Sequence, residues 1–460
     1  MTTICILGAG LAGSEAAWQL AERGLKVRLI DMKPETLSPA HSDPNFAELV
    51  CSNSLRSSKF ASASGLLKHE LRHFSSLIME AADATSLPAG GALAVDREAF
   101  PRYISERLQQ HPNIELLCEQ IQDLDALTDN YQIIASGPLT AGKLFRSIET
   151  FSGSDNLYFF DAAAPLIEDS SINKSIAFMA SRYEDGEGDY LNCPLNAQEY
   201  TAFREALLTA DKVVPRGFEK ELLFEACKPV EALAEDGVDT LRFGPLKPVG
   251  LPLPQTGQEA YAVVQLRQDD FARNLWNMVG FQSRLKFPEQ QRVFRMIPGL
   301  ERAEFARYGV MHRNSFICSP RVLTSNYRSL KEPKRFFAGQ ITGVEGYLES
   351  TASGLLAALT LAADLGFYDP QLLALASSRE TVIGGLANYV CQAKADNFQP
   401  MKANFSLLSE LSREDIHCYR QRYGLKLRGR AERRCYYSIR SLEKLGLEAD
   451  QIKKLYEEEH

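Results

Sequence analysis

Two cysteines stand among polar residues, where a thiol is free to react. Cys51 opens the polar run C-S-N-S and precedes the cation Arg56, and Cys227 is followed directly by Lys228. A buried structural cysteine usually has apolar neighbours, whereas nearby cations lower the pKa of a thiol and favour the nucleophilic thiolate. The pattern indicates two candidate catalytic thiols, although an exposed cysteine without a role would have the same surroundings.

The other cysteines do not suggest a metal site or a disulfide framework. All nine are scattered along the chain, and none forms a C-x-x-C pair. Such pairs are typical of zinc sites and of redox-active disulfides. His312 also lacks a cysteine or carboxylate at metal-ligand spacing. We therefore expect no metal.

The N-terminal segment predicts a dinucleotide site. Residues 4–7 form a short apolar run, and glycines in G-x-G-x-x-G spacing follow it directly. A helical pattern then covers residues 14–23, and a second strand pattern at 26–30 ends at an acidic residue. In this arrangement the helix N-terminus binds a pyrophosphate and the acid accepts a ribose hydroxyl. The candidate cofactor residues are Gly8, Ala9, Gly10, Leu11, Ala12, Gly13 and Asp31.

A second glycine turn lies late in the chain. Residues 336–338 predict a strand, and residues 347–365 predict an Ala/Leu-rich helix. Between them stand the further cofactor candidates Gly339, Gln340, Gly343 and Gly346. A plain closing strand–helix unit of the sheet would have the same pattern. Because the complete fingerprint occurs once, we expect any NAD(P)H to bind transiently, without a Rossmann domain of its own.

Length and composition point to a multidomain globular enzyme. The chain has 460 residues, 45% of them hydrophobic and 24% charged, which is ordinary for a globular protein. We expect an α/β fold with a discontinuous Rossmann-like FAD-binding domain at 1–150 and 286–370. An inserted α+β domain would cover 151–285, and a basic helical C-terminal segment would cover 371–460. Apolar runs of membrane-spanning length and a basic, apolar leader are missing, so a cytoplasmic location without membrane contact is expected.

Basic residues gather in two places. The net charge is −8, so contact with nucleic acid requires a local patch. Residues 413–440 are rich in arginine with interleaved tyrosines, a composition that suits RNA phosphates and stacked bases but also a solvated helical surface. A smaller polar and basic cluster comprises Arg307, His312, Arg313 and Asn314.

Long motifs shared along the chain give a specific resemblance. CSNSLRS, GLLKHELR, PAGGALAVDRE, YLNCP, FEACKPVE, FGPLKPVGL, YAVVQLRQDD, RVFRMIPGLE, RYGVMHRN, FFAGQITGVEGYLES and FQPMKANF together span most of the sequence. With the N-terminal fingerprint, they closely resemble the folate- and FAD-dependent tRNA (uracil-5-)-methyltransferase family, TrmFO. The resemblance implies FAD as cofactor, methylenetetrahydrofolate as co-substrate, NAD(P)H as reductant and tRNA as partner. We expect no stable protein partner.

The implied reaction is methylation at C5 of the T-loop uridine, nucleotide 54, of tRNA, with FADH2 as reductant. Uracil C5 is a poor nucleophile, but a thiolate that adds at C6 makes it an enolate carbon. A base must then remove the C5 proton. The family's two functional cysteines lie in the CSNSLRS and FEACKPVE motifs, which here are Cys51 and Cys227. We assign Cys227 as the C6 nucleophile and Cys51 as a second thiol that handles protons or protects the flavin adduct.

Two departures from the family pattern leave alternatives open. Ala226 stands before the second cysteine, where the family usually has glycine. The C-terminal segment, the last fifty residues of this chain, is longer and more basic than the usual helical end of the family. The same chemistry on a 23S ribosomal RNA uridine therefore remains open. A flavin-dependent NAD(P)H oxidoreductase of small molecules and a flavin-bearing RNA-binding module without methyl transfer are further alternatives.

Overall fold

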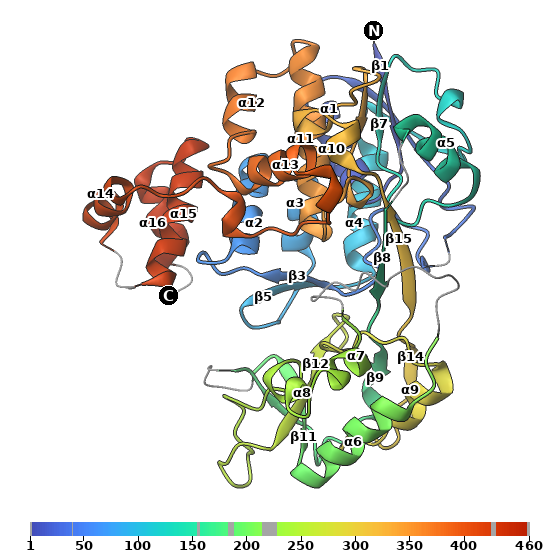
Figure 1. Ribbon diagram of the computed structural model, residues 1–460, viewed down its shortest axis with the longest axis vertical. Helices are drawn as coiled ribbons and strands as arrows, with labels where there is room; N and C mark the ends of the chain where they lie inside the picture. The colour runs from blue at the N-terminus through green and yellow to red at the C-terminus, as the bar shows by residue number, and fades with distance from the viewer. Residues whose placement is uncertain are drawn as a thin grey trace.

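The chain folds around two separate sheets (Figure 1). The computed structural model describes residues 2–38, 40–153, 157–182, 188–213, 228–424 and 429–457, and the side chains of 157–162, 311–313 and 397 are not described. The upper part in Figure 1 holds both described ends of the chain, and the lower part holds the second sheet. Cys227 lies outside the described residues.

The first sheet has five parallel strands. Its order is β16-β7-β1-β2-β6, and every neighbouring pair is parallel. The strands are β1 (Thr3–Leu7), β2 (Lys26–Asp31), β6 (Ile114–Cys118), β7 (Tyr131–Ile134) and β16 (Arg335–Phe337). Strand β1 is apolar and buried because it lies at the centre of the sheet. The parallel sheet confirms the predicted α/β class, and β16 joins it from some 200 residues beyond β7.

Two helices that follow glycine turns pack closely against each other. They are α1 (Leu11–Glu22) and α11 (Tyr347–Asp364). A Cβ on Gly354 would lie 2.1 Å from the carbonyl oxygen of Ala12, so only glycine permits this approach. The other helices of this part are α2 (Ala63–His73), α3 (Leu77–Ala84), α4 (Ala99–Gln110), α5 (Gly142–Ser152), α10 (Ser319–Val322), α12 (Pro370–Ala376) and α13 (Val382–Gln392). No helix within the described ranges is long and apolar enough to cross a membrane.

The second sheet is antiparallel and has six strands. Its order is β10-β11-β12-β13-β9-β14. The strands are β9 (Leu166–Glu168), β10 (Phe178–Ala180), β11 (Tyr190–Leu195), β12 (Ala262–Gln268), β13 (Leu275–Met278) and β14 (Phe305–Arg307). The helices beside it are α6 (Ala197–Thr209), α7 (Val230–Glu235), α8 (Thr240–Phe243) and α9 (Phe287–Phe294).

This second part extends beyond the predicted boundary at residue 285. Val293 and Phe294 of α9 are buried in its core, and β14 pairs with β9. The physical reason is that the apolar side of α9 is buried against the second sheet rather than the first. The structure therefore places residues 287–307 with the second sheet, whereas we predicted that the first domain resumes at 286.

Two smaller sheets complete the fold. Strands β8 (Leu157–Ala162) and β15 (Met311–Phe316) form an antiparallel ribbon between the two parts (Figure 1). Strands β3 (Ser54–Ser57), β4 (Ser86–Leu87) and β5 (Ala92–Val95) form the other sheet, in the order β3-β5-β4. Strand β3 carries the end of the CSNSLRS motif, so this sheet positions the loop of Cys51.

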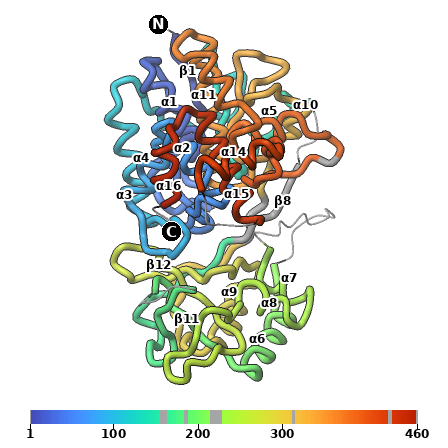
Figure 2. Tube along the Cα trace, turned by 90° about the vertical axis from the view of Figure 1, so that its left-hand side faces the viewer, coloured from blue at the N-terminus to red at the C-terminus, as the bar shows by residue number. Residues whose placement is uncertain are grey.

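The C-terminal segment is helical, as predicted, but its tyrosines are not displayed for stacking. Its helices are α14 (Arg413–Tyr423), α15 (Arg430–Lys444) and α16 (Ala449–Glu457). Helix α15 packs beside α2 (Figure 2), and α16 packs against α15. Tyr423, Tyr436 and Tyr437 are buried, and Tyr419 stacks on Tyr436. These rings fill the space between helices, which corrects the idea that they stack on RNA bases.

Candidate functional site

A cavity of about 220 Å³ opens beside Cys51. Its wall includes the loop at 50–56, the turn after β7 at Pro138, and the second glycine turn at Gln340 and Gly346. Gln282, from the second part of the chain, also lines it. The structure thus brings Cys51 together with the second glycine turn, about 290 residues further along the chain.

Tyr347 holds the backbone of the Cys51 loop. Its hydroxyl oxygen accepts hydrogen bonds from the N–H of Cys51 at 2.9 Å and from the N–H of Ser52 at 3.2 Å. Burial raises the pKa of the Tyr347 phenol well above its usual range, and Cys51 adds to this effect. The phenol therefore stays protonated near neutral pH. As the first residue of α11, it links the second glycine turn to the thiol loop.

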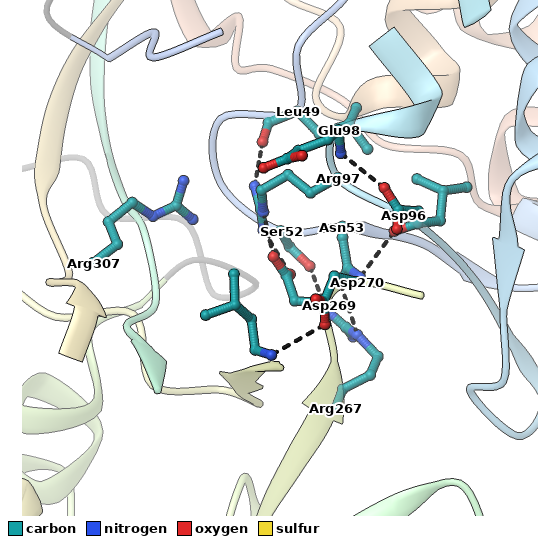
Figure 3. Close-up of polar contacts among 12 residues, drawn as sticks. Leu49, Ser52, Asn53, Asp96, Arg97, Glu98, Arg267, Asp269, Asp270 and Arg307 are labelled. Atoms are coloured by element: carbon teal, nitrogen blue, oxygen red, sulfur yellow. Dashed lines mark hydrogen bonds and ion pairs between the residues drawn. The ribbon is translucent and has the colours of Figure 1, made fainter. Parts of the chain in front are cut away.

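Two arginines from the second part of the chain reach the same loop (Figure 3). Arg267 on β12 donates from Nε to Asn53 Oδ1 at 3.0 Å and from Nη2 to Ser52 Oγ at 2.7 Å. Arg307, at the end of β14, lies apart from this network in Figure 3, and its Nη2 lies 3.5 Å from the carbonyl oxygen of Cys51. The loop of Cys51 is therefore held from both parts of the molecule.

Arg97 and Asp269 form the main ion pair between the two parts. Arg97 Nε lies 2.6 Å from Asp269 Oδ2, and Nη2 lies 3.0 Å from Oδ1, so the contact is bidentate. The third guanidinium nitrogen of Arg97, Nη1, donates to the carbonyl oxygen of Leu49. Asp269 is fully buried. Removing either partner would leave a buried charge without its counterion, which is costly.

The arginines make the surroundings of Cys51 electropositive. Burial opposes charge on Arg97, but the carboxylate of Asp269 more than offsets it and raises the pKa. Burial lowers the pKa of Arg307, and repulsion from Arg97 adds to this. Burial likewise lowers the pKa of Arg267. All three remain cations near pH 7 because an arginine starts from a pKa above 12. Such a field favours a thiolate or another anion beside the loop.

The first glycine turn has the shape of a pyrophosphate cradle. A Cβ on Gly8 would lie 2.4 Å from the carbonyl oxygen of Ala135, and one on Gly13 would lie 1.8 Å from that of Gly8. A Cβ on Gly10 would meet no protein atom within 4 Å. Gly8 and Gly13 are thus needed for packing. Gly10 leaves open space at the N-terminus of α1, where free N–H groups point outward.

Asp31 lies beside this turn, at the end of β2. Its Oδ2 accepts a hydrogen bond from the N–H of Ala9 at 2.6 Å, and its Oδ1 accepts one from the N–H of Lys33 at 2.9 Å. A carboxylate oxygen accepts more than one hydrogen bond, so the side chain can also receive one from a ribose. The turn and the acid together fit the adenosine diphosphate end of a dinucleotide.

The second glycine turn touches the first. A Cβ on Gly339 would lie 3.1 Å from the Cβ of Ala12, while one on Gly343 would lie 2.6 Å from the Phe398 ring. Gly346 has a φ of +124°, and a Cβ there would lie 2.2 Å from Glu349 Oε2. These glycines are therefore required by local packing. Their common effect is to bring the N-terminus of α11 next to that of α1.

The predicted residues do not all meet in one cavity. Cys51, Gln340, Gly346 and Asn314 line it together. The glycines of the first turn do not line it, but the carbonyl oxygen of Ala9 accepts a hydrogen bond from Ala47 N at 2.9 Å, close to the thiol loop. The side chains of His312 and Arg313 are outside the description, as is Cys227. Within the described residues, no cluster of three metal-ligating side chains is found.

Sequence reasoning missed the residues that hold the thiol loop. Arg97, Arg267, Asp269 and Tyr347 lie inside motifs quoted for the resemblance, but neither periodicity nor spacing relates them to Cys51. Their contacts join residues 172 to 296 positions apart. Only the motifs themselves, because they are long and specific, could have directed attention to them.

Sequence comparison now decides the family. The family model described as "Glucose inhibited division protein A" matches residues 3–366. A curated protein of Natranaerobius thermophilus, named methylenetetrahydrofolate–tRNA-(uracil-5-)-methyltransferase TrmFO, is 54% identical over 411 residues, covering 89% of this chain and 94% of its own. One of Enterococcus faecalis with the same name is 52% identical over 91% of this chain and 95% of its own.

The chain belongs to the TrmFO family. The resemblance inferred from the motifs is thereby confirmed. Among solved structures, GidA of Aquifex aeolicus superimposes with a TM-score of 0.65 at 15% identity, covering 99% of this chain and 75% of that one. A second crystal form gives 0.62. At this identity the likeness concerns the fold, and it agrees with the α/β architecture of this TrmFO chain.

Proposed function

We propose that the protein is a folate-dependent methyltransferase that acts on C5 of the T-loop uridine, nucleotide 54, of tRNA. Methylenetetrahydrofolate would donate the carbon, and FADH2, formed with NAD(P)H, would be the reductant. The observation that carries the proposal is the position of Cys51, in the wall of a cavity shared with the second glycine turn and surrounded by arginines. The names of relatives with about 50% identity over most of the chain support it.

The two glycine turns are the proposed site of FAD. The open space at Gly10 and the carboxylate of Asp31 suit its pyrophosphate and ribose. Gln340 and Gly346 would contact its ring end, because they line the cavity of Cys51. When bound, FAD would supply the electrons that turn the transferred carbon into a methyl group. Methylenetetrahydrofolate and the target uracil would bind in the cavity of Cys51, beside the ring end of FAD.

The residues of this chain would activate the uracil. We propose that the thiolate of Cys227 forms a bond to C6, which makes C5 a nucleophile toward the one-carbon unit. Loss of the C5 proton to a base, followed by departure of the thiolate from C6, restores the ring double bond. Cys51 would take part in that proton transfer. Arg97, Arg267 and Arg307 would keep a thiolate at position 51 stable.

The experiment that tests the proposed function follows a labelled carbon. The protein is incubated with an unmodified tRNA transcript, NADPH and methylenetetrahydrofolate labelled at the methylene carbon, and the label is mapped on the RNA. Label on C5 of nucleotide 54 supports the proposal. Label on ribosomal RNA but not on tRNA contradicts the substrate, and label that arrives only from S-adenosylmethionine contradicts the carbon donor.

The cysteine roles need a separate test. A tRNA that contains 5-fluorouridine traps a covalent adduct, because fluorine at C5 cannot leave as a proton does. We expect the adduct to persist in Cys51→Ala and to disappear in Cys227→Ala. The reverse result would exchange the two roles.

A further inference from the structure

A stripe of exposed arginines on α15 has no assigned role. Arg430, Arg433 and Arg434, here called the arginine stripe, are exposed at the start of this helix. Within the described residues, no carboxylate forms an ion pair with any of them. Their neighbour Glu432 is buried and is paired instead with Arg420 of α14, at 2.8 and 2.7 Å. The stripe therefore presents positive charge to solvent on a chain whose net charge is −8.

The stripe does not serve the folding of α15. Arg440, on the same helix, donates to the carbonyl oxygen of Ser409 at 2.6 Å, and Arg422 pairs with Glu443 at 2.8 Å. These arginines hold α15 against the rest of the protein. By comparison, the side chains of Arg430, Arg433 and Arg434 form no hydrogen bond or ion pair with the described residues, so they can contact an external anion.

The stripe lies at the N-terminal end of α15, ahead of the contact between this helix and Phe60. Ser438 packs inward, because its Oγ donates to the carbonyl oxygen of Phe60 at 2.6 Å. Arg434 and Arg430 stand four and eight residues earlier, about 40° and about 80° around the helix from Ser438, so they turn from this contact toward solvent. At 1.5 Å per residue they lie about 6 and about 12 Å beyond this contact along the helix axis.

Two segments connect α15 to the wall of the cavity. One runs from Phe60 through the exposed Lys59 to Arg56, which lines the cavity and lies 2.9 Å from Glu349. The other begins at Phe405, whose ring stacks on Tyr437 with a centroid distance of 5.6 Å.

The second segment leads back along the chain from Phe405 to Lys402 and contacts Glu349, the carboxylate that also binds Arg56. The N–H of Ala403 donates to Glu349 Oε1 at 2.8 Å, and Lys402 precedes it in the chain. Basic side chains thus stand at intervals between the cavity of Cys51 and the arginine stripe.

The surroundings favour a nucleic-acid backbone over a membrane. Helices that lie in a membrane surface bury large apolar side chains below their basic residues. Here the exposed residues at the start of the helix are Arg430, Ala431, Arg433 and Arg434, and the large apolar residues of α15 are already buried in the protein. Charge without apolar anchors is typical of phosphate contacts, which position a nucleic acid without reading its sequence.

We infer that the arginine stripe of α15, together with Lys59, binds phosphates of the RNA whose uridine enters the cavity. The inference rests on the proposed function for the identity of the RNA, and it adds a binding surface outside the catalytic cavity. These contacts hold the part of the RNA that flanks the target uridine. They contribute to affinity and not to the chemical step.

The test measures how RNA binding depends on salt. The Kd of an unmodified tRNA transcript is measured between 50 and 300 mM salt for the wild-type protein and for the variant R430Q/R433Q/R434Q. Each lost phosphate contact lowers the slope of log Kd against log salt by about 1. We expect the slope to fall by about 3, with KM for the RNA raised about 10-fold or more and kcat at saturating RNA unchanged.

The matched control removes the same charge elsewhere. Arg102, Lys143 and Arg302 are also exposed, and R102Q/K143Q/R302Q should keep the wild-type slope. The lysine variant R430K/R433K/R434K should restore most of the slope, because lysine also neutralises phosphate. If the triple glutamine variant folds poorly, as judged by thermal unfolding, the variant K59Q/R434Q should lower the slope by about 2.

Several results would overturn the inference. An unchanged slope in R430Q/R433Q/R434Q would do so, as would the same loss in the control variant. Loss of binding to phosphatidylglycerol vesicles with unchanged RNA binding would assign the stripe to a membrane. The proposed function fails separately: a wild-type protein that binds the transcript through the stripe but transfers no carbon to it would contradict the function and leave the surface intact.

Discussion

The hydroxyl oxygen of Tyr347 lies 2.9 Å from the backbone nitrogen of Cys51, although 296 positions separate the two residues in the chain. Tyr347 opens α11 directly after the second glycine turn. A single side chain therefore fixes the thiol loop relative to the turn proposed to receive the ring end of the cofactor. The predictions below test this relationship and the contacts around it.

Tyr347→Phe removes the acceptor of two backbone N–H groups and should loosen the Cys51 loop. We expect a loss of about 1–2 kcal/mol in the free energy of unfolding. The rate of methyl transfer should fall about 10-fold or more, because small displacements of reacting groups are costly. Tyr389→Phe, which removes a hydroxyl that donates to Gln399, is the matched control. Equal rates for the two variants would contradict the role of Tyr347.

Asp269→Asn should weaken the contact between the two parts of the molecule. It leaves Arg97 without its buried counterion, and breaking such a pair costs about 3–5 kcal/mol. We expect a lower unfolding temperature and faster proteolysis between the parts. Asp239→Asn, which removes the exposed partner of Arg242, should change the stability by less than about 1 kcal/mol.

A double-variant cycle checks the cause of that loss. If Arg97→Met in the Asp269→Leu background costs far less than Arg97→Met alone, the ion pair is responsible. Additive losses would show that the two side chains act independently.

Gly10→Ala and Gly13→Ala should fail in different ways. At Gly10 a methyl group meets no protein atom, so the unfolding temperature of the FAD-free protein should be near that of the wild type. The methyl group would nevertheless occupy the proposed place of the pyrophosphate, and the Kd for FAD should rise at least about 10-fold. At Gly13 the methyl group collides with the backbone, so the FAD-free protein itself should be destabilised. Normal FAD binding by Gly10→Ala would contradict the cradle.

Lys68 should make stability depend on pH. It is fully buried and donates to the carbonyl oxygens of Arg56, Ser57 and Ser64. Burial lowers the pKa of Lys68 to about 7, with repulsion from Arg72 adding to the effect, whereas an exposed lysine titrates near 10.5. Between these values the unfolded chain binds more protons than the folded one, so stability rises with pH.

The comparison with Lys68→Met isolates this dependence. Below pH 7 the penalty for the buried charge is complete, and it is relieved as the pH rises from 7 toward 10.5. Because one pKa unit is worth about 1.4 kcal/mol, wild-type stability should rise relative to the variant by an amount on the order of 5 kcal/mol. For Lys143→Met, at an exposed site, the free energy of unfolding should depend on pH as it does in the wild type. The same pH dependence of the free energy of unfolding in Lys68→Met and the wild type would contradict the prediction.

The local elements of the fold could be predicted from the sequence. The apolar run at 4–7, the glycine spacing and the Ala/Leu pattern after residue 347 each determine a strand, turn or helix through their own residues. The apolar residues between Gly65 and Ile78 recur at helical spacing and predict an amphipathic helix there. The structure divides it into α2 and α3, because Ser75 has a φ of +53° and Ser76 caps the second helix.

The packing between distant segments could not be predicted. Periodicity predicts that α9 has an apolar side, but not which sheet that side packs against. Val293 and Phe294 are buried against the second sheet, and this depends on the packing of both cores. The same holds for Arg97 and Asp269, whose pairing depends on how the two parts meet. The site was predictable only where one motif supplied it, as at Cys51, while the side chains that position this loop and make its surroundings positive come from four other segments.

The central claim is that the cavity of Cys51 is where the carbon reaches uracil, and single-turnover transfer tests it most directly. Transfer of label from methylenetetrahydrofolate to an unmodified tRNA transcript is compared for the wild type, Cys51→Ala and Cys193→Ala, the last a fully buried cysteine in the core of the second part. We expect label at C5 of nucleotide 54 in the wild type and in Cys193→Ala, and a rate at least about 100-fold lower in Cys51→Ala. A wild-type rate in Cys51→Ala, or loss of transfer in Cys193→Ala alone, would contradict the account.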